Sequence, residues 1–228
     1  MNHHQIEKAA SKLQRELWDR RADFFPGREP SYFEVLDPEL ATIHLGVNFA
    51  LCDTLGKFGS NADRFEVAGS VDRQSNRISV SRKFRADIVR FTAAHEIGHW
   101  LLHQGAVMHR DRPIYGLETG FNQKRSPIER EADCFAANFL MPRKLVKRTF
   151  ARLFGSDFVF DDASAFQLSP GDPEAFLRPR ENSLSRELIL ATARSFNGLH
   201  FKSLADQFLV SPTTMAIRLR ELNLTPWP

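Results

Sequence analysis

The sequence predicts an α+β protein in which a small antiparallel sheet is followed by helices. Apolar residues recur at helical spacing near the start of the chain. They alternate with polar residues over 65–72 and 77–82, and helical spacing returns from residue 86 onward. Strands that precede a run of helices, rather than alternating with them, are typical of this fold class.

The first helix is expected over residues 2–25. Its apolar positions repeat at helical spacing, and they are Ile6, Ala9, Ala10, Leu13 and Leu17. Pro26-Gly27 ends this helix, because both residues break helical geometry. The following stretch is ambiguous: residues 43–49 favour a strand, and residues 49–55 favour a short helix or a turn.

A β-hairpin or meander is expected next, with a turn in the polar segment 72–76, and it leads directly into a helix from about Ala86 to Leu102. The polar segment 104–125 is long for a connection within a compact domain, which favours a lid or a loop at the edge of a substrate site. Another helix begins at Ser126-Pro127, with Ser at the N-cap and Pro at the first helical position.

Helix-breaking residues and local composition divide the chain after residue 126 into segments. Met141-Pro142 separates the helix after Ser126 from a further helix that ends near Phe154, and residues 155–182 are rich in Pro, Gly, Ser and Asp. We predict a first domain over residues 1–155, a linker or irregular segment over 156–182, and a helical region over 183–228 with helix-turn-helix form.

The overall composition narrows the class of protein. The chain has 228 residues, of which 42% are hydrophobic, enough to bury a core, and its net charge of +3 is too small for a nucleic-acid coat. Cys52 and Cys134 make neither a CxxC pair nor a disulfide framework. We see no signal-peptide layout and no apolar run that could span a membrane, so a cytoplasmic protein is expected.

The string HEIGH at residues 95–99 is an HExxH motif within the expected helix 86–102. Two histidines four positions apart lie about 40° apart around a helix axis and roughly one turn along it. His95 and His99 can therefore reach one metal ion, with Glu96 beside it. Zinc in hydrolases typically takes three protein ligands and leaves one position for water. We expect one Zn²⁺ per chain and a third ligand from elsewhere.

A carboxylate from the next helix is favoured as that third ligand. The metzincin pattern is excluded, because Gly105 stands where it requires His, and His103 lies on the same straight helix as the first two ligands. Glu129 can ligate while Asp133, four positions later, accepts a hydrogen bond from a ligand histidine. Glu131 points about 160° away from Asp133 and is the reserve ligand. Two His and one carboxylate favour zinc in a hydrolase, with manganese and iron as alternatives.

The expected chemistry is hydrolysis. Zinc lowers the pKa of bound water toward about 7, and Glu96 can take the proton and later give it to a leaving amine. A developing oxyanion needs a hydrogen-bond donor besides the metal. Tyr115 and His109, between the two helices, are the candidate transition-state stabilisers.

Two linked motifs resemble the ImmA/IrrE family of zinc metallopeptidases. The string RFTAAHEIGHWLLH at residues 90–103 is similar to the active-site helix of that family, and the pattern E..A..FA..LMP matches at residues 129–142. With the hairpin before them, the resemblance covers roughly residues 40–150. It implies a zincin-like, gluzincin-like domain with His95, His99 and Glu129 as metal ligands and Glu96 as general base. Asp133 stands where many members have Asn.

The resemblance also implies a substrate class. Members of that family typically cleave a helix-turn-helix repressor, so we expect a zinc-dependent endopeptidase acting on a regulatory protein, with the repressor encoded nearby. Two alternatives act by binding: a DNA-binding regulator with a non-catalytic metal site, and a toxin–antitoxin or phage-defence partner. The scissile bond, the activating signal and the oligomeric state are left open.

The C-terminal region could bind DNA or serve as a packing module. Ser211 and Pro212 begin its last helix, and Thr213, Thr214, Arg218 and Arg220 are the residues a DNA-binding helix would use. Glu221 opposes that use, so packing is favoured. A run of basic residues could also meet phosphates or an acidic patch, although a solvated helix face is favoured; these are Arg143, Lys144, Lys147, Arg148 and Arg152.

Overall fold

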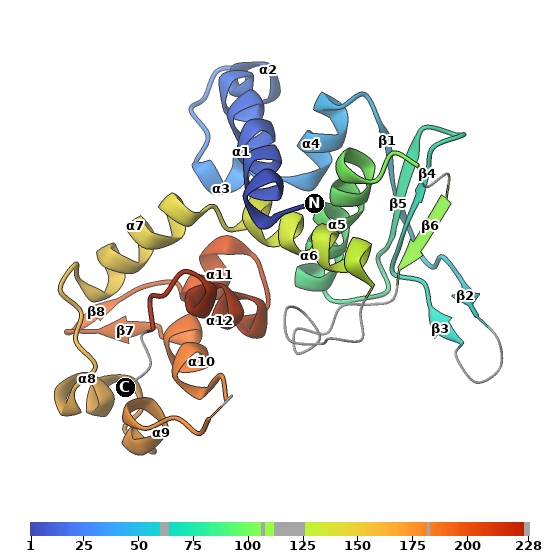
Figure 1. The fold of residues 1–228 in the computed structure, drawn as a ribbon. Coiled ribbons are helices and arrows are strands. Elements are labelled where there is room, and N and C mark those ends of the chain that lie inside the picture. Colours follow the sequence, from blue (N-terminus) through green and yellow to red (C-terminus); the bar gives the residue numbers. More distant parts are fainter. Residues whose placement is uncertain (60–63, 106–107, 112–125, 182, 226–228) are drawn as a thin grey trace. The chain divides into compact units, whose positions relative to one another are not determined.

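The computed structural model describes residues 1–59, 64–105, 108–111, 126–181 and 183–225 (Figure 1). It is a mixture of helices and small sheets, which confirms the α+β class. The chain divides into two compact units, residues 1–140 and 141–228. This division precedes the expected boundary at residue 155, because the helix of residues 143–154 groups with the C-terminal unit. Each unit is described by itself.

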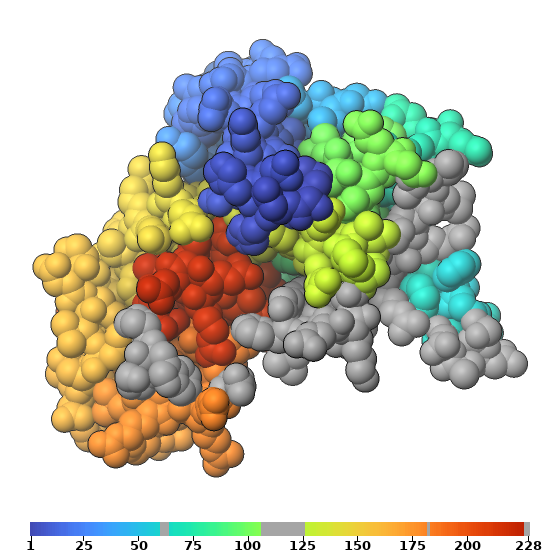
Figure 2. All heavy atoms as spheres, in the orientation of Figure 1, coloured from blue at the N-terminus to red at the C-terminus, as the bar shows by residue number. Residues whose placement is uncertain are grey.

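The first unit begins with helices, the longest of which packs on the later helix α6. The elements are α1 (His3–Asp19), α2 (Arg21–Phe24), α3 (Tyr32–Val35) and α4 (Pro38–His44). The single helix expected over 2–25 is therefore interrupted at Arg20. Asn2 and Gln5 form a capping box at the start of α1, and Ile6, Leu13 and Leu17 are buried. Figure 2 shows α1, in dark blue, beside the yellow-green atoms of α6 (Pro127–Leu140).

The strand expected over residues 43–49 is wrong in position. The Asp37 side chain accepts a hydrogen bond from the Glu39 amide at 2.7 Å, and Pro38 occupies the first turn, so a helix forms and continues to His44. The strand β1 follows at Asn48–Cys52, a stretch that had been divided between a strand and a helix or turn. Local capping therefore decided the conformation of Ile43, which lies inside α4.

A four-stranded sheet forms the β layer of the first unit. Its order is β1-β5-β4-β6, with β4 at Gly69–Asp72, β5 at Arg77–Ser81 and β6 at Met108–Asp111. The predicted hairpin is β4 and β5, and Asp72 stabilises its turn by accepting a hydrogen bond from the Gln74 amide. The sheet is not fully antiparallel as expected, since β1 runs parallel to β5. A separate antiparallel pair contains β2 (Lys57–Phe58) and β3 (Phe65–Glu66).

The HExxH helix lies inside this unit. Helix α5 spans Ala86–Leu102, as predicted, and every residue from Phe91 to His99 is buried. It contacts β4 and β5 as well as α6 (Figure 1). A helix that is buried on all sides in its middle holds its polar side chains away from bulk water.

The second unit is helical around a cluster of phenylalanines. Its elements are α7 (Arg143–Phe154), α8 (Asp162–Leu168), α9 (Pro173–Leu177), α10 (Ser185–Thr192), β7 (Ser195–Phe196), β8 (Leu199–His200), α11 (Leu204–Phe208) and α12 (Pro212–Glu221). Successive ring centroids in the cluster lie 4.9–6.4 Å apart; the rings are Phe150, Phe154, Phe158, Phe160, Phe176, Phe196 and Phe201. Aromatic pairs at these separations stabilise a core.

Two expectations for the second unit need correction. Residues 156–182 contain α8 and α9, whose N-caps are Asp161 and Asp172, so this segment is more ordered than an irregular linker. The region after 183 is not all helical, because β7 and β8 form a small hairpin. Its turn residues Asn197 and Gly198 have φ of 49° and 75°, the left-handed conformation that a two-residue hairpin turn requires.

Helix α12 is packed rather than exposed. Ser211 caps it as predicted, yet Thr214 and Arg218 are buried. The Arg218 side chain donates to the Met141 carbonyl oxygen at 3.1 Å and contacts Glu221, while Arg220 contacts Glu187 at 2.8 Å. Both arginines that a DNA-binding helix would use are thus engaged within the unit.

Among the described residues, no helix combines the length and apolar composition needed to cross a membrane.

Replacing Arg218 with Ala is expected to destabilise the second unit. The change removes a buried charged donor from the Met141 carbonyl oxygen, so we expect the free energy of unfolding to fall by about 2–4 kcal/mol. Chemical denaturation followed by circular dichroism measures the loss. Lys147→Ala on the exposed face of α7 is the control and should stay within about 0.5 kcal/mol. Equal stability of the two variants would contradict the packing role of Arg218.

Candidate metal centre

Close contact between α5 and α6 creates the candidate site. A Cβ atom at Gly98 would lie 3.1 Å from the Ala132 Cα atom and 3.2 Å from the Ala132 carbonyl oxygen. A larger residue at position 98 would therefore push against the backbone of α6. Because Glu129 lies about one turn before Ala132, this approach brings its carboxylate to the histidines of α5.

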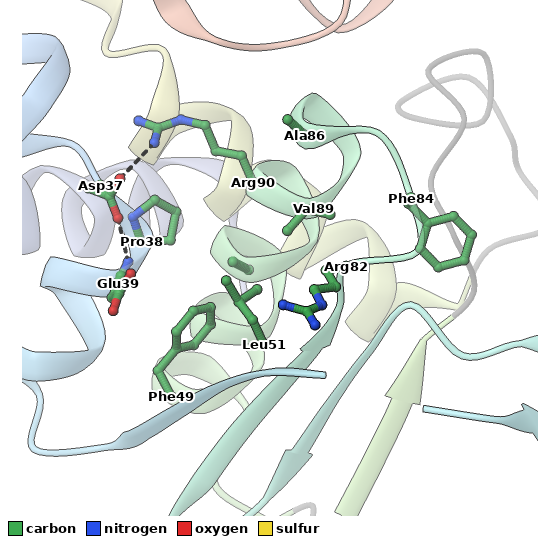
Figure 3. Close-up of a pocket in the computed structure, with 11 residues that line it drawn as sticks. Asp37, Pro38, Glu39, Phe49, Leu51, Arg82, Phe84, Ala86, Val89 and Arg90 are labelled. Atoms are coloured by element: carbon green, nitrogen blue, oxygen red, sulfur yellow. Dashed lines mark hydrogen bonds and ion pairs between the residues drawn. The ribbon is translucent and has the colours of Figure 1, made fainter. Parts of the chain in front are cut away.

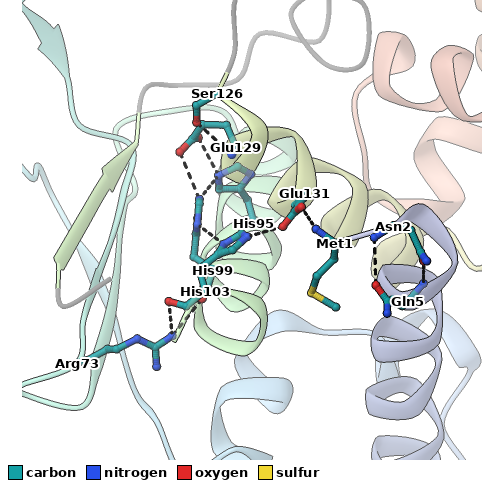
Figure 4. Close-up of polar contacts among 10 residues, drawn as sticks. All are labelled: Met1, Asn2, Gln5, Arg73, His95, His99, His103, Ser126, Glu129 and Glu131. Atoms are coloured by element: carbon teal, nitrogen blue, oxygen red, sulfur yellow. Dashed lines mark hydrogen bonds and ion pairs between the residues drawn. The ribbon is translucent and has the colours of Figure 1, made fainter. Parts of the chain in front are cut away.

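Three side chains converge at the crossing of the two helices, and Figure 4 shows their ligand atoms facing one another. The Nε2 atoms of His95 and His99 are 3.0 Å apart. Glu129 places Oε2 at 3.4 Å from His95 Nε2 and Oε1 at 3.6 Å from His99 Nε2. His95 and His99 are buried, and the Glu129 side chain is 15% exposed.

This donor set fits a metal ion. Ligand atoms held about 2.0–2.1 Å from a tetrahedral zinc ion lie roughly 3.3 Å apart. The separations of 3.0, 3.4 and 3.6 Å are close to that value. Two imidazoles and one carboxylate are also the ligand types of a hydrolytic zinc site. His95, His99 and Glu129 can therefore hold a metal ion.

The carboxylate of Asp133 contacts the His95 ring on the side away from the converging donor atoms. Its Oδ1 atom is 2.8 Å from His95 Nδ1, the ring nitrogen opposite the converging Nε2 atoms. A carboxylate in this place accepts a hydrogen bond from Nδ1–H, which fixes the tautomer that leaves a lone pair on Nε2 for a metal. Asp133 thus lies where the predicted supporting role requires it, and the role itself stays a prediction.

Glu96 is fully buried beside a glycine that the sequence analysis did not single out. A Cβ atom at Gly69, the first residue of β4, would lie 2.1 Å from Glu96 Oε1 and 2.7 Å from Thr92 Cγ2. Only a residue without a side chain leaves space for the Glu96 carboxylate there. A glycine inside a strand signals such a close approach, but it does not say which side chain approaches.

Glu131, the reserve ligand, contacts a different histidine. Its Oε2 atom is 2.9 Å from His103 Nε2, and its Oε1 atom contacts the amino group of Met1 (Figure 4). These hydrogen bonds, from Met1 first and then from His103, hold the pKa of the Glu131 carboxyl below its usual value. Glu131 therefore does not join the three converging donors.

The two candidate transition-state stabilisers are not placed by the structure. Tyr115 lies outside the described residues. The backbone of His109 belongs to β6, where it pairs with Val71, but its side chain also lies outside what the structure describes. Both assignments stay predictions.

A separate cavity of about 350 Å³ lies between α4, β1 and the first turns of α5 (Figure 3). Phe49 and Leu51 line it with Arg82 and Arg90, and Arg90 donates to Asp37 at 3.2 Å. The cavity is formed at the opposite end of α5 from His99, so it is distinct from the donor set.

Comparison with known proteins identifies the protein family to which the chain belongs. Residues 55–171, just over half of the chain, match the family model of the IrrE N-terminal-like domain, peptidase M78. The chain therefore belongs to this peptidase family, which supports a metallopeptidase-type function and a protein substrate. A search of curated proteins found no match.

Removing the Glu129 carboxylate should abolish tight metal binding. We expect wild-type protein to bind one zinc ion per chain and Glu129→Ala to bind it more than about 100-fold more weakly, because a donor is lost. Competition with a chromophoric chelator measures the affinity. Arg130→Ala, at the exposed neighbouring position on α6, is the control and should bind zinc as the wild type does. Unchanged affinity in Glu129→Ala would remove Glu129 from the ligand set.

Proposed function

We propose that this chain is a zinc-dependent endopeptidase that hydrolyses a peptide bond in a regulatory protein. The observation that supports this most strongly is the convergence of His95, His99 and Glu129 at the buried crossing of α5 and α6, with Glu96 on the same helix. Family membership supports the peptidase class, and the donor set supports the choice of metal.

Each side chain has a role in this proposal. A zinc ion held by the three donors would lower the pKa of water and polarise a substrate carbonyl group. Glu96 acts as the general base that removes the water proton and as the acid that returns it to the leaving amine. Asp133 fixes the tautomer and orientation of His95 through its Nδ1 atom. Gly69 leaves the space in which the Glu96 carboxylate lies.

The proposed substrate is a helix-turn-helix transcriptional repressor encoded near this gene. This part of the proposal depends on the resemblance of residues 90–103 and 129–142 to ImmA/IrrE peptidases. The direct test incubates the zinc-loaded protein with the purified product of the neighbouring repressor gene and identifies cut fragments by mass spectrometry. A stable stoichiometric complex with no cut product would favour the alternative in which the protein acts by binding.

The DNA-binding alternative has less support. Arg218 and Arg220 contact Met141, Glu187 and Glu221 within the C-terminal unit, so they are not presented as a basic surface of α12. The basic residues of α7 are exposed, as expected of a solvated helix face. Salt-dependent DNA binding by metal-free protein would favour this alternative.

Replacing Glu96 with Gln should separate metal binding from catalysis. The amide cannot accept the water proton, so we expect the cleavage rate to fall by about 10²–10⁴-fold while zinc content stays at the wild-type level. Metal analysis and a fragment assay on the same samples measure both quantities. Glu174→Gln, an exposed change in the second unit, is the control. Cleavage at the wild-type rate by Glu96→Gln would show that the mechanism is wrong.

Replacing Gly69 with Ala should displace Glu96 without removing the metal. The new methyl group would lie 2.1 Å from Glu96 Oε1 and 2.7 Å from Thr92 Cγ2, so the Glu96 carboxylate and the Thr92 methyl group must both shift. We expect cleavage to fall by at least about 10-fold with zinc affinity unchanged. Gly171→Ala is the matched control, because nothing lies within 4 Å of a Cβ atom there. Full activity in Gly69→Ala would mean that Glu96 acts from another position.

A further inference from the structure

Two histidines of α5, His95 and His99, form a continuous row with His103, the residue that follows the helix. The ring centroids of His95 and His99 are 4.7 Å apart, and those of His99 and His103 are 4.9 Å apart. The sequence does not favour His103 as a metal ligand, because it is expected on the same straight helix as His95 and His99. Instead, its Nδ1 atom is 2.9 Å from His99 Nδ1, and its Nε2 atom is 2.9 Å from Glu131 Oε2 (Figure 4).

The direction of these hydrogen bonds follows from the orientation of His99. Its Nε2 atom faces His95 and Glu129, so this nitrogen would offer its lone pair to a metal and the ring proton would be on Nδ1. His99 Nδ1–H then donates to His103 Nδ1. The remaining ring proton of His103 is on Nε2, from which it donates to the Glu131 carboxylate. Each ring nitrogen of His99 and His103 thus acts once, as a metal ligand, a hydrogen-bond donor or a hydrogen-bond acceptor.

Backbone hydrogen bonds hold His103 in the position from which it contacts both His99 and Glu131. His103 is the C-cap residue of α5, and its amide donates to the His99 carbonyl oxygen at 3.1 Å. The guanidinium of Arg73, from the turn between β4 and β5, donates to the carbonyl oxygens of His99 at 3.1 Å, Trp100 at 2.6 Å and His103 at 3.3 Å. A cation placed at the C-terminus of a helix stabilises its last carbonyl groups.

Burial strengthens the contacts. The side chains of His103 and Glu131 are 10% and 19% exposed, so water competes weakly for their hydrogen bonds. His95 has its own carboxylate in Asp133, at 2.8 Å from Nδ1. His99 Nδ1 instead faces the imidazole of His103 at 2.9 Å, and that imidazole connects His99 to the Glu131 carboxylate.

We propose that His103 and Glu131 are a positioning pair that fixes the tautomer and ring orientation of His99 as a metal ligand. This inference rests on the proposed metal site and extends it: the two ligand histidines would be supported in different ways, one directly by a carboxylate and one through a second imidazole. Supporting partners of ligand histidines typically change metal affinity by about 10–100-fold.

The test compares zinc affinity in variants of His103, by competition with a chromophoric chelator. His103→Phe keeps the ring volume and removes the acceptor, so zinc should bind about 10–100-fold more weakly. His103→Asn places an amide oxygen near the position of Nδ1 and should restore most of the affinity. His200→Phe, the same change at an exposed histidine of the second unit, is the control and should leave affinity unchanged.

A double-mutant cycle tests whether the two residues act as a unit. Glu131→Leu alone should weaken zinc binding, but adding it to His103→Phe should cause little further loss, because both changes remove the same support. Cobalt-substituted protein gives a second readout: the visible absorption of the bound ion should change in His103→Phe and return toward the wild-type spectrum in His103→Asn. A purely structural role would not give this recovery.

The outcomes are distinguishable. Wild-type zinc affinity and cobalt spectrum in His103→Phe would overturn the positioning role while leaving the proposed function intact. Wild-type protein that binds no zinc would overturn both, since no ligand would then need positioning. If His103→Phe fails to fold by circular dichroism, His103→Ala replaces it in the same comparison with His103→Asn.

Discussion

The close approach of α5 to α6 at Gly98 is the constraint on which the candidate site depends. A Cβ atom there would lie 3.1–3.2 Å from the backbone of Ala132, so the helices can cross at this distance only with little bulk between them. Glycine inside a helix costs about 1 kcal/mol relative to alanine. The compensation is a crossing tight enough for a carboxylate on α6 to reach two imidazoles on α5.

The acidic residues of α6 divide their contacts among the histidines of α5. Glu129 faces His95 and His99 together, Asp133 contacts His95, and Glu131 contacts His103. Polar groups that leave water need partners to offset the cost of desolvation. The acids at alternate positions of α6 supply such partners to the row of imidazoles. Each of the three acids contacts a different set of ring nitrogens.

The sequence predicted those parts of the fold that local chemistry specifies. The helix expected over 86–102 has the bounds of α5, and Ser126-Pro127 predicted the start of α6. The strand expected over 43–49 is wrong because the capping signal of Asp37 and Pro38, which starts a helix there, outweighs the apolar character of the stretch. The turn signal of Asn197-Gly198 was present in the sequence but was missed among helical patterns.

The candidate site was predictable only where its residues share one helix. Metal-ligand spacing within one helix can be read from sequence, and the pair Glu129 and Asp133 had the spacing of one helix face. The contact of Gly69 with Glu96 and that of His103 with Glu131 join residues more than 25 positions apart. Such pairs depend on how the strand and the helices cross, which no local pattern encodes.

The donors, Glu96 and their supporting side chains all belong to the unit of residues 1–140. The second unit has its own aromatic core and two buried arginines, Arg186 and Arg218. The chemistry proposed for the site therefore draws on side chains of the first unit, which the crossing of α5 and α6 at Gly98 brings together.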